Sequence, residues 1–253
     1  MARGIIRAAV VLALCAVRAR SAHAAFPVAF GTSWDGPSNT LQKIVDARYG
    51  AGAIHVTADY VGAHPGDHDP WFWSDRGFSA LILREIAGNA NRNIVGWYKE
   101  NGVMPVIDGV DDAIVFDGPA GPGGLPVVVT LGPTVVDFGF YLNPNGTRSA
   151  PNAPEPECFF TNRFYNDIGP DGSGALHPPT DGDVQALVYD VSPWSGPNTW
   201  LVCFEDLDSG AQPSPCCAGT DNDFNDFVFE VTAVGVTPVA ATSLGAIKVR
   251  YLH

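Results

Sequence analysis

The chain has 253 residues, of which 46% are hydrophobic and 16% are charged, with 27 acidic residues against 14 basic ones. The resulting formal net charge of −13 argues against binding to nucleic acid or anionic lipid and favours cations as partners. The length allows one sizeable β domain or two small ones.

The first 24 residues are typical of a cleaved export signal. Two arginines give a basic start, residues 8–17 form a short apolar core, and Ala22 and Ala24 supply the small-residue spacing that a signal peptidase needs. The apolar core is too short to span a bilayer, and no later stretch is long and apolar enough to be a membrane helix. We therefore predict a signal peptide over residues 1–24 and a protein that is secreted or held at the cell surface.

The remaining chain is more acidic still. The predicted signal contains four of the 14 basic residues and no acidic ones, which leaves ten basic residues against 27 acidic ones, a net charge of −17. We assign residues 25–235 to one β-sandwich domain and residues 236–253 to a C-terminal tail. The tail is similar to short endings of some exported bacterial proteins, so it is either a sorting segment or a frayed terminus.

One helix is expected, over residues 39–50. Asn39 is a suitable N-cap, Leu41, Ile44 and Val45 form an apolar stripe at helical spacing, and Gly50 is a suitable end. We expect at most this one short helix.

Ten other short segments are rich in Val, Ile, Phe, Tyr and Trp and are separated by glycine and proline, which together make up 49 residues. They are residues 54–60, 79–87, 92–99, 112–118, 126–131, 135–143, 158–165, 184–191, 199–206 and 226–234. Many short strands separated by turn residues indicate an all-β fold, either a sandwich or a barrel. We predict a β-sandwich, with a jelly roll as one candidate topology.

Four cysteines follow the predicted signal, namely Cys158, Cys203, Cys216 and Cys217. An even number in an exported chain favours disulfides. Three pairings are possible; because a bridge between the neighbours Cys216 and Cys217 is strained, we favour a disulfide from each of them to Cys158 or Cys203. A zinc site is the competing interpretation, but no C-x-x-C spacing or nearby histidine supports it.

The most informative segment lies between the last two predicted strands. The run over 199–206 ends in two acidic residues, a connection of about a dozen residues follows, and the run from 226 begins after a second acidic cluster. If the two strands pair as a hairpin, these acidic residues lie together. Six carboxylates gather there without a lysine or arginine between them: Glu205, Asp206, Asp208, Asp221, Asp223 and Asp226.

Such a cluster predicts a bound cation. Two carboxylates about 5 Å apart repel by roughly 1–3 kcal/mol at surface dielectrics. Calcium accepts six to eight oxygen ligands from carboxylates, amides and carbonyls, whereas magnesium keeps its waters and tolerates irregular sites poorly. The alternative is that these residues only form turns. We predict a shared calcium site whose ligands are Glu205, Asp206, Asp221, Asp223, Asn225 and Asp226.

An EF-hand does not explain the pattern. Asp221, Asp223 and Asn225 match its first three ligand positions, but its sixth position requires glycine and is Asp226, and its twelfth requires glutamate and is Thr232. No helix is expected on either side.

The acidic segment resembles a known family. Residues 204–207 (FEDL) and 221–231 (DNDFNDFVFEV) are similar to the signature of an exported bacterial family, domain of unknown function 4114. Residues 30–46, 81–101 and 137–146 are similar to its usual neighbourhood. The resemblance implies an exported calcium-binding β-sandwich of surface and matrix-type proteins with no known reaction. This chain departs from the pattern in its longer connection, which contains Cys216 and Cys217.

Three further clusters carry weaker signals. Residues 64–69 (HPGDHD) are better explained as a surface turn than as a metal site. Residues 70–73 (PWFW) either close the end of the sandwich or form a sugar-stacking platform with Trp71 and Trp73. Residues 167–183 contain four aspartates and form either turns or a second cation site.

No catalytic motif is evident. The chain has no G-x-S-x-G elbow, no phosphate-binding loop and no pair of separate carboxylates with distinct roles. We therefore expect a non-catalytic binding or structural domain that uses calcium and has an extracellular glycan or surface protein as a candidate partner. A calcium-dependent carbohydrate-binding module and a polysaccharide-acting hydrolase are the alternatives.

Overall fold

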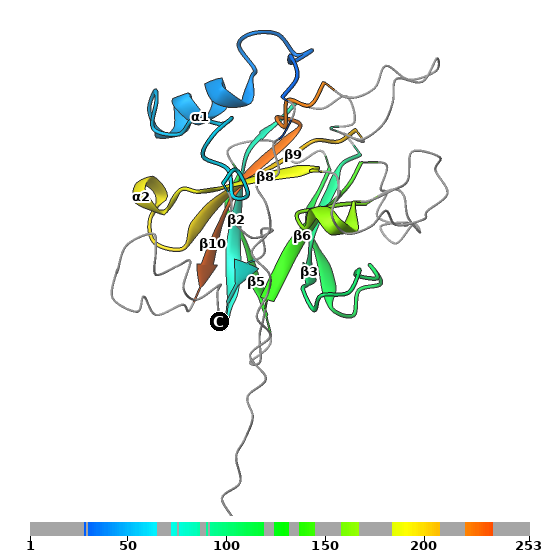
Figure 1. Cartoon of the computed structure of the whole chain (residues 1–253). Coiled ribbons are helices and arrows are strands. Elements are labelled where there is room, and N and C mark those ends of the chain that lie inside the picture. The colour runs from blue at the N-terminus through cyan, green and yellow to red at the C-terminus, as the bar shows by residue number, and fades with distance from the viewer. Residues whose placement is uncertain are drawn as a thin grey trace, which may run out of the picture.

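The computed structural model describes residues 28, 30–64, 72–74, 76–86, 90, 92–118, 124–131, 137–144, 158–166, 184–207 and 221–234. Over these residues the chain is mostly β, with two antiparallel sheets that pack face to face (Figure 1). The all-β prediction is confirmed. Three predicted features lie outside the described residues: the signal peptide, the C-terminal tail and the adjacent cysteines Cys216 and Cys217.

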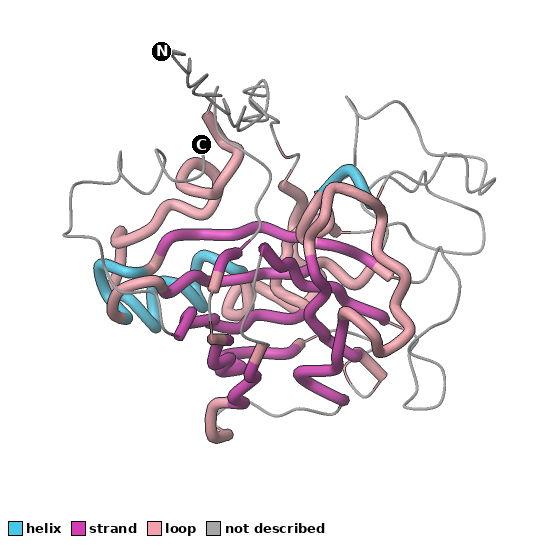
Figure 2. Tube along the Cα trace, turned by 90° about the horizontal axis from the view of Figure 1, so that it is seen from below, coloured by secondary structure: helices cyan, strands magenta, loops and turns pink. Residues whose placement is uncertain are grey.

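Each sheet has five strands. In the first sheet, the strand order is β1 (Phe72–Trp73), β6 (Asp137–Asn143), β3 (Ile94–Lys99) and β4 (Asp112–Asp117), and β7 (Phe159–Phe160) also pairs with β6. In the second sheet, the order is β5 (Val127–Thr130), β2 (Gly77–Glu85), β10 (Phe227–Val234), β9 (Thr199–Phe204) and β8 (Ala186–Asp190). Seen as in Figure 2, the strands form the centre of the molecule and the helices and loops lie around them.

Helix α1 (Leu41–Tyr49) lies within the predicted range, but its N-cap differs from the prediction. Thr40, not Asn39, caps the helix, since its hydroxyl accepts a hydrogen bond from the backbone N–H of Lys43. Gly50 ends the helix with a φ of 102°, a conformation that glycine adopts without strain.

A second helix was not predicted. The one-turn α2 (Ser192–Ser195) follows β8, and a single 3-10 turn, η1 (Arg163–Tyr165), follows β7. Both are too short to leave a periodic apolar pattern in the sequence.

Nine of the ten predicted strand runs contain a strand, and the run over 54–60 is wrong. Residues 54–60 form turns instead. Ile54, Val56 and Tyr60 are buried against the outer face of the second sheet, so their alternation reflects packing and not strand pairing. The short β1 was not predicted as a strand.

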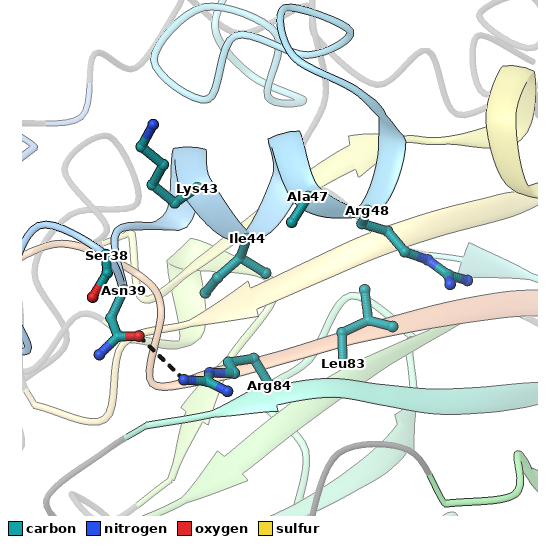
Figure 3. A pocket seen from close by; sticks show the side chains of 8 residues that line it. All are labelled: Ser38, Asn39, Lys43, Ile44, Ala47, Arg48, Leu83 and Arg84. Atoms are coloured by element: carbon teal, nitrogen blue, oxygen red, sulfur yellow. Dashed lines mark hydrogen bonds between the residues drawn. The ribbon is translucent and has the colours of Figure 1, made fainter.

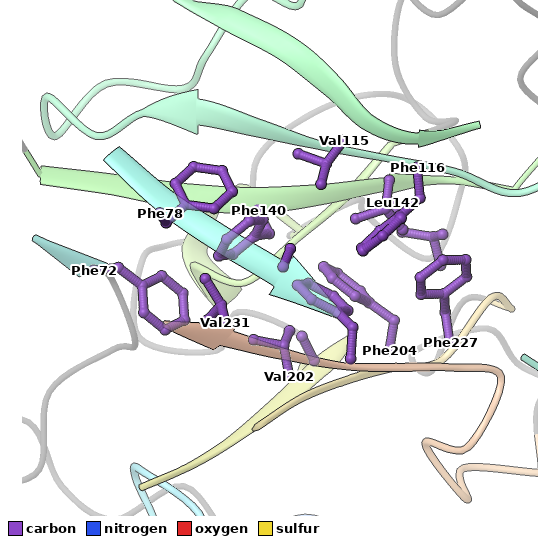
Figure 4. Close-up of a cluster of buried hydrophobic side chains, with 14 of the residues drawn as sticks. Phe72, Phe78, Val115, Phe116, Phe140, Leu142, Val202, Phe204, Phe227 and Val231 are labelled. Atoms are coloured by element: carbon purple, nitrogen blue, oxygen red, sulfur yellow. The ribbon is translucent and has the colours of Figure 1, made fainter. Parts of the chain in front are cut away.

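The core between the sheets is largely aromatic (Figure 4). Phe140 of β6 meets Phe229 of β10 edge to face, with ring centroids 5.1 Å apart, and Phe78 of β2 stacks on Phe138 at 5.0 Å. These rings are fully buried, and burial of one phenylalanine side chain contributes about 1.5–3 kcal/mol. The inner faces of the two sheets thus hold the sandwich together.

The outer faces of both sheets are also covered, which explains why the strands read as nearly continuous apolar runs. In β9, Val202 and Phe204 face the inner core, whereas Leu201 and Cys203 face a second cluster beneath α1. A third cluster, which includes Tyr98 and Cys158, covers the first sheet.

The structure contradicts the predicted disulfide at Cys203. Cys203 is a fully buried free thiol, and burial raises its pKa well above the ordinary value. Its side chain is directed into the cluster beneath α1. The predicted disulfide between Cys203 and Cys216 or Cys217 is therefore not present in this structure.

Candidate metal centre

The last hairpin brings the two acidic segments together, as predicted. β9 and β10 pair antiparallel, with Phe204 opposite Phe227 at the end where the connecting loop leaves β9 and enters β10. Asp206, just after β9, therefore lies beside Asp226, just before β10. The backbone N–H of Asp206 donates a hydrogen bond to Oδ2 of Asp226 at 2.8 Å.

Glu205, Asp206 and Asp226 form the first of two carboxylate groups, which we call the inner group. One carboxylate oxygen from each lies within 4.8 Å of the other two. All three residues are buried, with exposed fractions of 0%, 4% and 7%. Carboxylates are almost never buried to this degree unless they are paired or coordinate a metal.

Two residues that the sequence did not single out border the inner group. Glu85, at the end of β2, is opposite Phe227 in the sheet register, and burial followed by the charge of Asp206 raises its pKa to about 7. Asn93 is fully buried and donates from Nδ2 to Asp206 at 3.3 Å. Its Oδ1 has no hydrogen-bond partner among the described residues.

The electrostatic environment of Asp226 is unfavourable for a free carboxylate. Burial, followed by the charges of Glu205 and Asp206, raises its pKa to about 10. The one hydrogen bond that opposes this shift comes from the backbone of Asp206. At neutral pH this side chain therefore requires either a proton or a neighbouring positive charge.

The second group, which we call the outer group, consists of Asp35, Asp221 and Asp223. Their carboxylate oxygens also lie within 4.8 Å of one another, and exposure decreases from Asp35 to Asp223. Burial and then the charge of Asp221 raise the pKa of Asp35. Burial is also the main cause that raises the pKa of Asp223 to about 6. The backbone N–H of Trp34 donates to Asp221 at 2.7 Å, which joins the N-terminal segment to this group.

Asn225 lies beside the outer group and is fully buried. Its Nδ2 is within hydrogen-bonding distance of three oxygens, from Asp223, from the hydroxyl of Ser33 and from the carbonyl of Asn39. An amide NH₂ has only two hydrogens to donate. Its Oδ1 has no partner among the described residues, so a buried oxygen of a neutral ligand type is available at this group.

The loop that carries these residues has an unusual backbone. Asn222 and Phe224 adopt left-handed conformations, with φ of 49° and 55°. Asparagine tolerates this region, whereas a bulky residue there is strained by about 1–2 kcal/mol. The conformation is maintained by burial of Phe224 against Phe30 and by the backbone N–H groups of Asp223 and Phe224, which both face Oε2 of Glu205.

The six predicted ligands therefore lie in two neighbouring groups instead of one shared site. Glu205, Asp206 and Asp226 are together, Asp221 and Asp223 are in the outer group, and Asn225 lies beside it. Asp35 was missed because it sits in an ordinary Gly/Pro/Ser turn about 190 residues away from its partners in the sequence. Glu85 was missed because only the strand register reveals its neighbour.

Several other predicted site residues lie outside the described residues, including Asp208, His68, Trp71 and the segment 167–183. His64 is described, but the rest of its histidine and aspartate cluster is not. Among the described residues, no helix is long and apolar enough to cross a membrane.

Comparisons with protein-family models, with curated proteins and with solved structures find no match to this chain. The resemblance to domain of unknown function 4114 therefore stays a prediction, and the function has to be argued from the carboxylate groups themselves.

Proposed function

We propose that this protein is an exported β-sandwich domain that binds calcium at the base of its last hairpin and acts as a binding or structural module of a surface or matrix-type protein. The observation that carries the proposal is the inner group, in which three buried carboxylates have oxygens within 4.8 Å of one another.

Electrostatics favours a cation at this group. Two unit charges at this separation repel by roughly 3 kcal/mol at an effective dielectric of about 20. A divalent cation between them converts the repulsion into attraction for each carboxylate at once. Hydrogen bonds from Asn93 and from backbone N–H groups relieve part of the repulsion. Protonation relieves more of it but becomes less favourable as the pH rises.

The donor set fits calcium better than other common metals. The two groups offer carboxylate and amide oxygens and contain no histidine or cysteine, which are the preferred ligands of zinc. Calcium accepts six to eight oxygens in irregular geometry, whereas magnesium requires near-octahedral coordination and retains waters. In the inner group Glu205, Asp206 and Asp226 would hold the ion, with Glu85 and Oδ1 of Asn93 close by.

The outer group is a second place for an oxygen-preferring ion, with Asp35, Asp221 and Asp223 as anionic ligands and Asn225 as a neutral one. Asp35 comes from the N-terminal segment and the others come from the last hairpin. An ion here would join two distant parts of the chain and stabilise the fold.

A non-catalytic role is supported by the burial of the carboxylates. General acids and bases must reach a substrate, but the inner group is almost wholly buried. The pocket between α1 and β2 contains none of these carboxylates among its lining residues.

The proposal is tested by calorimetric titration of calcium into EDTA-treated protein, together with thermal unfolding with and without calcium. We expect measurable binding and a higher Tm with calcium, since a ligand that binds only the folded state stabilises it. The variant Asp226→Asn should lose at least about tenfold in calcium affinity. Its apo form should keep its stability, because Asp226 without calcium is already protonated at neutral pH and the amide is its neutral counterpart, with an oxygen that accepts from Asp206.

The matched control is Asp111→Asn, which removes an exposed carboxylate on the other sheet. It should leave calcium affinity unchanged. A Tm that does not respond to EDTA, together with no heat of binding, would overturn the proposal.

A further inference from the structure

A pocket lies between helix α1 and strand β2, on the outer face of the second sheet (Figure 3). Its volume of about 460 Å³ falls within the range of small-molecule sites. Figure 3 shows Ile44 and Leu83 between the helix and the strand, with Arg84 and Arg48 on either side. Lys43, on the first turn of α1, also lines the pocket, but its side chain is directed away from Leu83 and Arg84.

A β-bulge places Arg84 in this pocket. In a regular strand, successive side chains face opposite sides of the sheet, and Phe78, Ala80 and Ile82 all face the inner core. By this alternation Arg84 would face inward too. The pairing of β2 with β10 shifts, however, because Val228 is opposite Arg84 while Phe229 is opposite Ile82.

The shift leaves Leu83 as an extra residue, and both Leu83 and Arg84 line the pocket. Bulges are over-represented at sheet edges and next to active sites, where they redirect a side chain or end the strand pairing. A guanidinium that would otherwise be directed toward the apolar core is thereby presented to the pocket between α1 and β2.

The pocket concentrates positive charge in a strongly acidic protein. Lys43, Arg48 and Arg84 are three of the ten basic residues that follow the predicted signal, and no carboxylate is among the lining residues. Arg48 is neutralised by Glu230, with an Nη2–Oε2 distance of 2.8 Å.

The other two cations have no such partner. Arg84 donates from Nη2 to the neutral Oδ1 of Asn39 at 3.1 Å. Within the part of the chain that the structure describes, neither Arg84 nor Lys43 forms an ion pair with a carboxylate. The pocket therefore retains the uncompensated charge of Arg84 beside an apolar floor formed by Ile44 and Leu83, and Lys43 is exposed on the same helix.

We propose that this pocket binds a compact anionic ligand that carries a carboxylate, sulfate or phosphate group next to an apolar face, the chemistry of an acidic sugar. The planar guanidinium of Arg84 suits a two-point contact with an oxyanion, and the exposed, flexible side chain of Lys43 supplies a second charge when it rotates toward the bound ligand. Ile44 and Leu83 contact the apolar face of the ligand. This binding requires no residue of the two carboxylate groups.

The test is a titration of the full mature chain with glucuronate and with inorganic sulfate, in a calcium-containing buffer, followed by amide chemical shifts in NMR spectra. Glucose serves as the neutral counterpart of glucuronate. We expect saturable shifts confined to amides of α1 and of β2 near Leu83 and Arg84 with both anions, and none with glucose.

The variants Arg84→Gln and Lys43→Gln should each weaken glucuronate binding by at least about fivefold. Arg84→Lys should recover only part of the loss, because the charge returns without the planar donor pair. The control Lys99→Gln removes an exposed positive charge from the other sheet and should change nothing. Unchanged calcium affinity and Tm in Arg84→Gln separate this result from a failure of the calcium site.

Three outcomes would overturn the proposal. The first is the absence of saturable binding by either anion. The second is an equal loss of binding in Lys99→Gln, which would indicate general charge attraction. The third is binding of glucose as strong as that of glucuronate, which would remove the role of the two cations.

Discussion

Asn225 donates a hydrogen bond from Nδ2 to the backbone carbonyl of Asn39 at 2.8 Å, across 186 positions of sequence. This contact joins the loop before β10 to the residue two positions before helix α1. The same Asn39 accepts from Arg84 through its side chain. The carboxylate groups and the basic pocket are therefore built on a shared piece of backbone.

The first prediction concerns the hydrogen bond from Asn225 to Asn39. Asn225→Ala removes the hydrogen bonds to Asn39 and Ser33 and leaves the partly buried carbonyl of Asn39 without this donor, so we expect a loss of about 1–3 kcal/mol in the free energy of unfolding. Urea unfolding measures the loss. Asn101→Ala, in an exposed turn, should change it by no more than about 0.5 kcal/mol. Equal effects of the two substitutions would mean that the hydrogen bond from Asn225 to Asn39 contributes nothing to stability.

The second prediction concerns pH. The folded protein raises the pKa of Asp223 to about 6 and that of Glu85 to about 7, above their ordinary values of 3.8 and 4.5. A carboxyl with a raised pKa binds its proton more tightly in the folded state, so its contribution is present at low pH and is lost as the pH rises through the folded pKa. In EDTA, we expect the Tm to fall between about pH 4 and pH 7, the span from the ordinary to the raised pKa values.

Calcium should abolish much of this dependence, because the cation replaces the proton. Thermal unfolding across the pH range, with calcium and with EDTA, gives the two slopes. Glu85→Gln should reduce the slope in EDTA. A Tm in EDTA that rises over this pH range would show that the carboxylates are already compensated by other groups.

The third prediction concerns the close approach of Gly31 to the acidic loop. Its backbone N–H donates to the carbonyl of Asn222 at 3.1 Å, and a Cβ at this position would overlap the carbonyl oxygen of Asp221. Gly31→Ala should therefore separate the N-terminal segment from the loop and lower stability by about 1–3 kcal/mol. Thermal unfolding checks this, with Gly124→Ala as the control, since nothing lies within 4 Å of a Cβ there. Equal Tm values for both variants would refute the contact.

The fourth prediction compares two ion pairs. Glu230 is largely buried, with 8% of its side chain exposed, and binds Arg48, Tyr49 and Ser195. Burial acts to raise the pKa of Glu230, but the hydrogen bonds from these three residues lower it overall. Arg48→Met leaves this carboxylate without its cation, so we expect a loss of about 1–3 kcal/mol, measured by urea unfolding.

The control for this prediction is Lys99→Met. Lys99 pairs with Asp111 at 3.3 Å, but both side chains are exposed, so its removal should lower stability by only about 0–1 kcal/mol. The expected difference between the variants reflects burial of the carboxylate. A larger effect at Lys99 would contradict this explanation.

The sequence alone determined the fold class and the last hairpin. Apolar runs separated by glycine and proline predict where strands lie in the chain. The pattern shows which residues are buried, but it does not show which strand each one pairs with. The acidic residues at the end of β9 and the start of β10 were placed together because two adjacent strands of an antiparallel sheet pair with their neighbouring ends aligned.

Only the tertiary structure decided how the carboxylates are grouped and which distant residues join them. Asp35 reaches the outer group through packing of the N-terminal segment, and Glu85 reaches the inner group through its register with Phe227. The bulge that presents Arg84 to the pocket between α1 and β2 likewise depends on how β2 pairs with β10. The sequence pattern does not show strand register or contacts between remote segments. Register and these contacts determine which charged side chains lie close together.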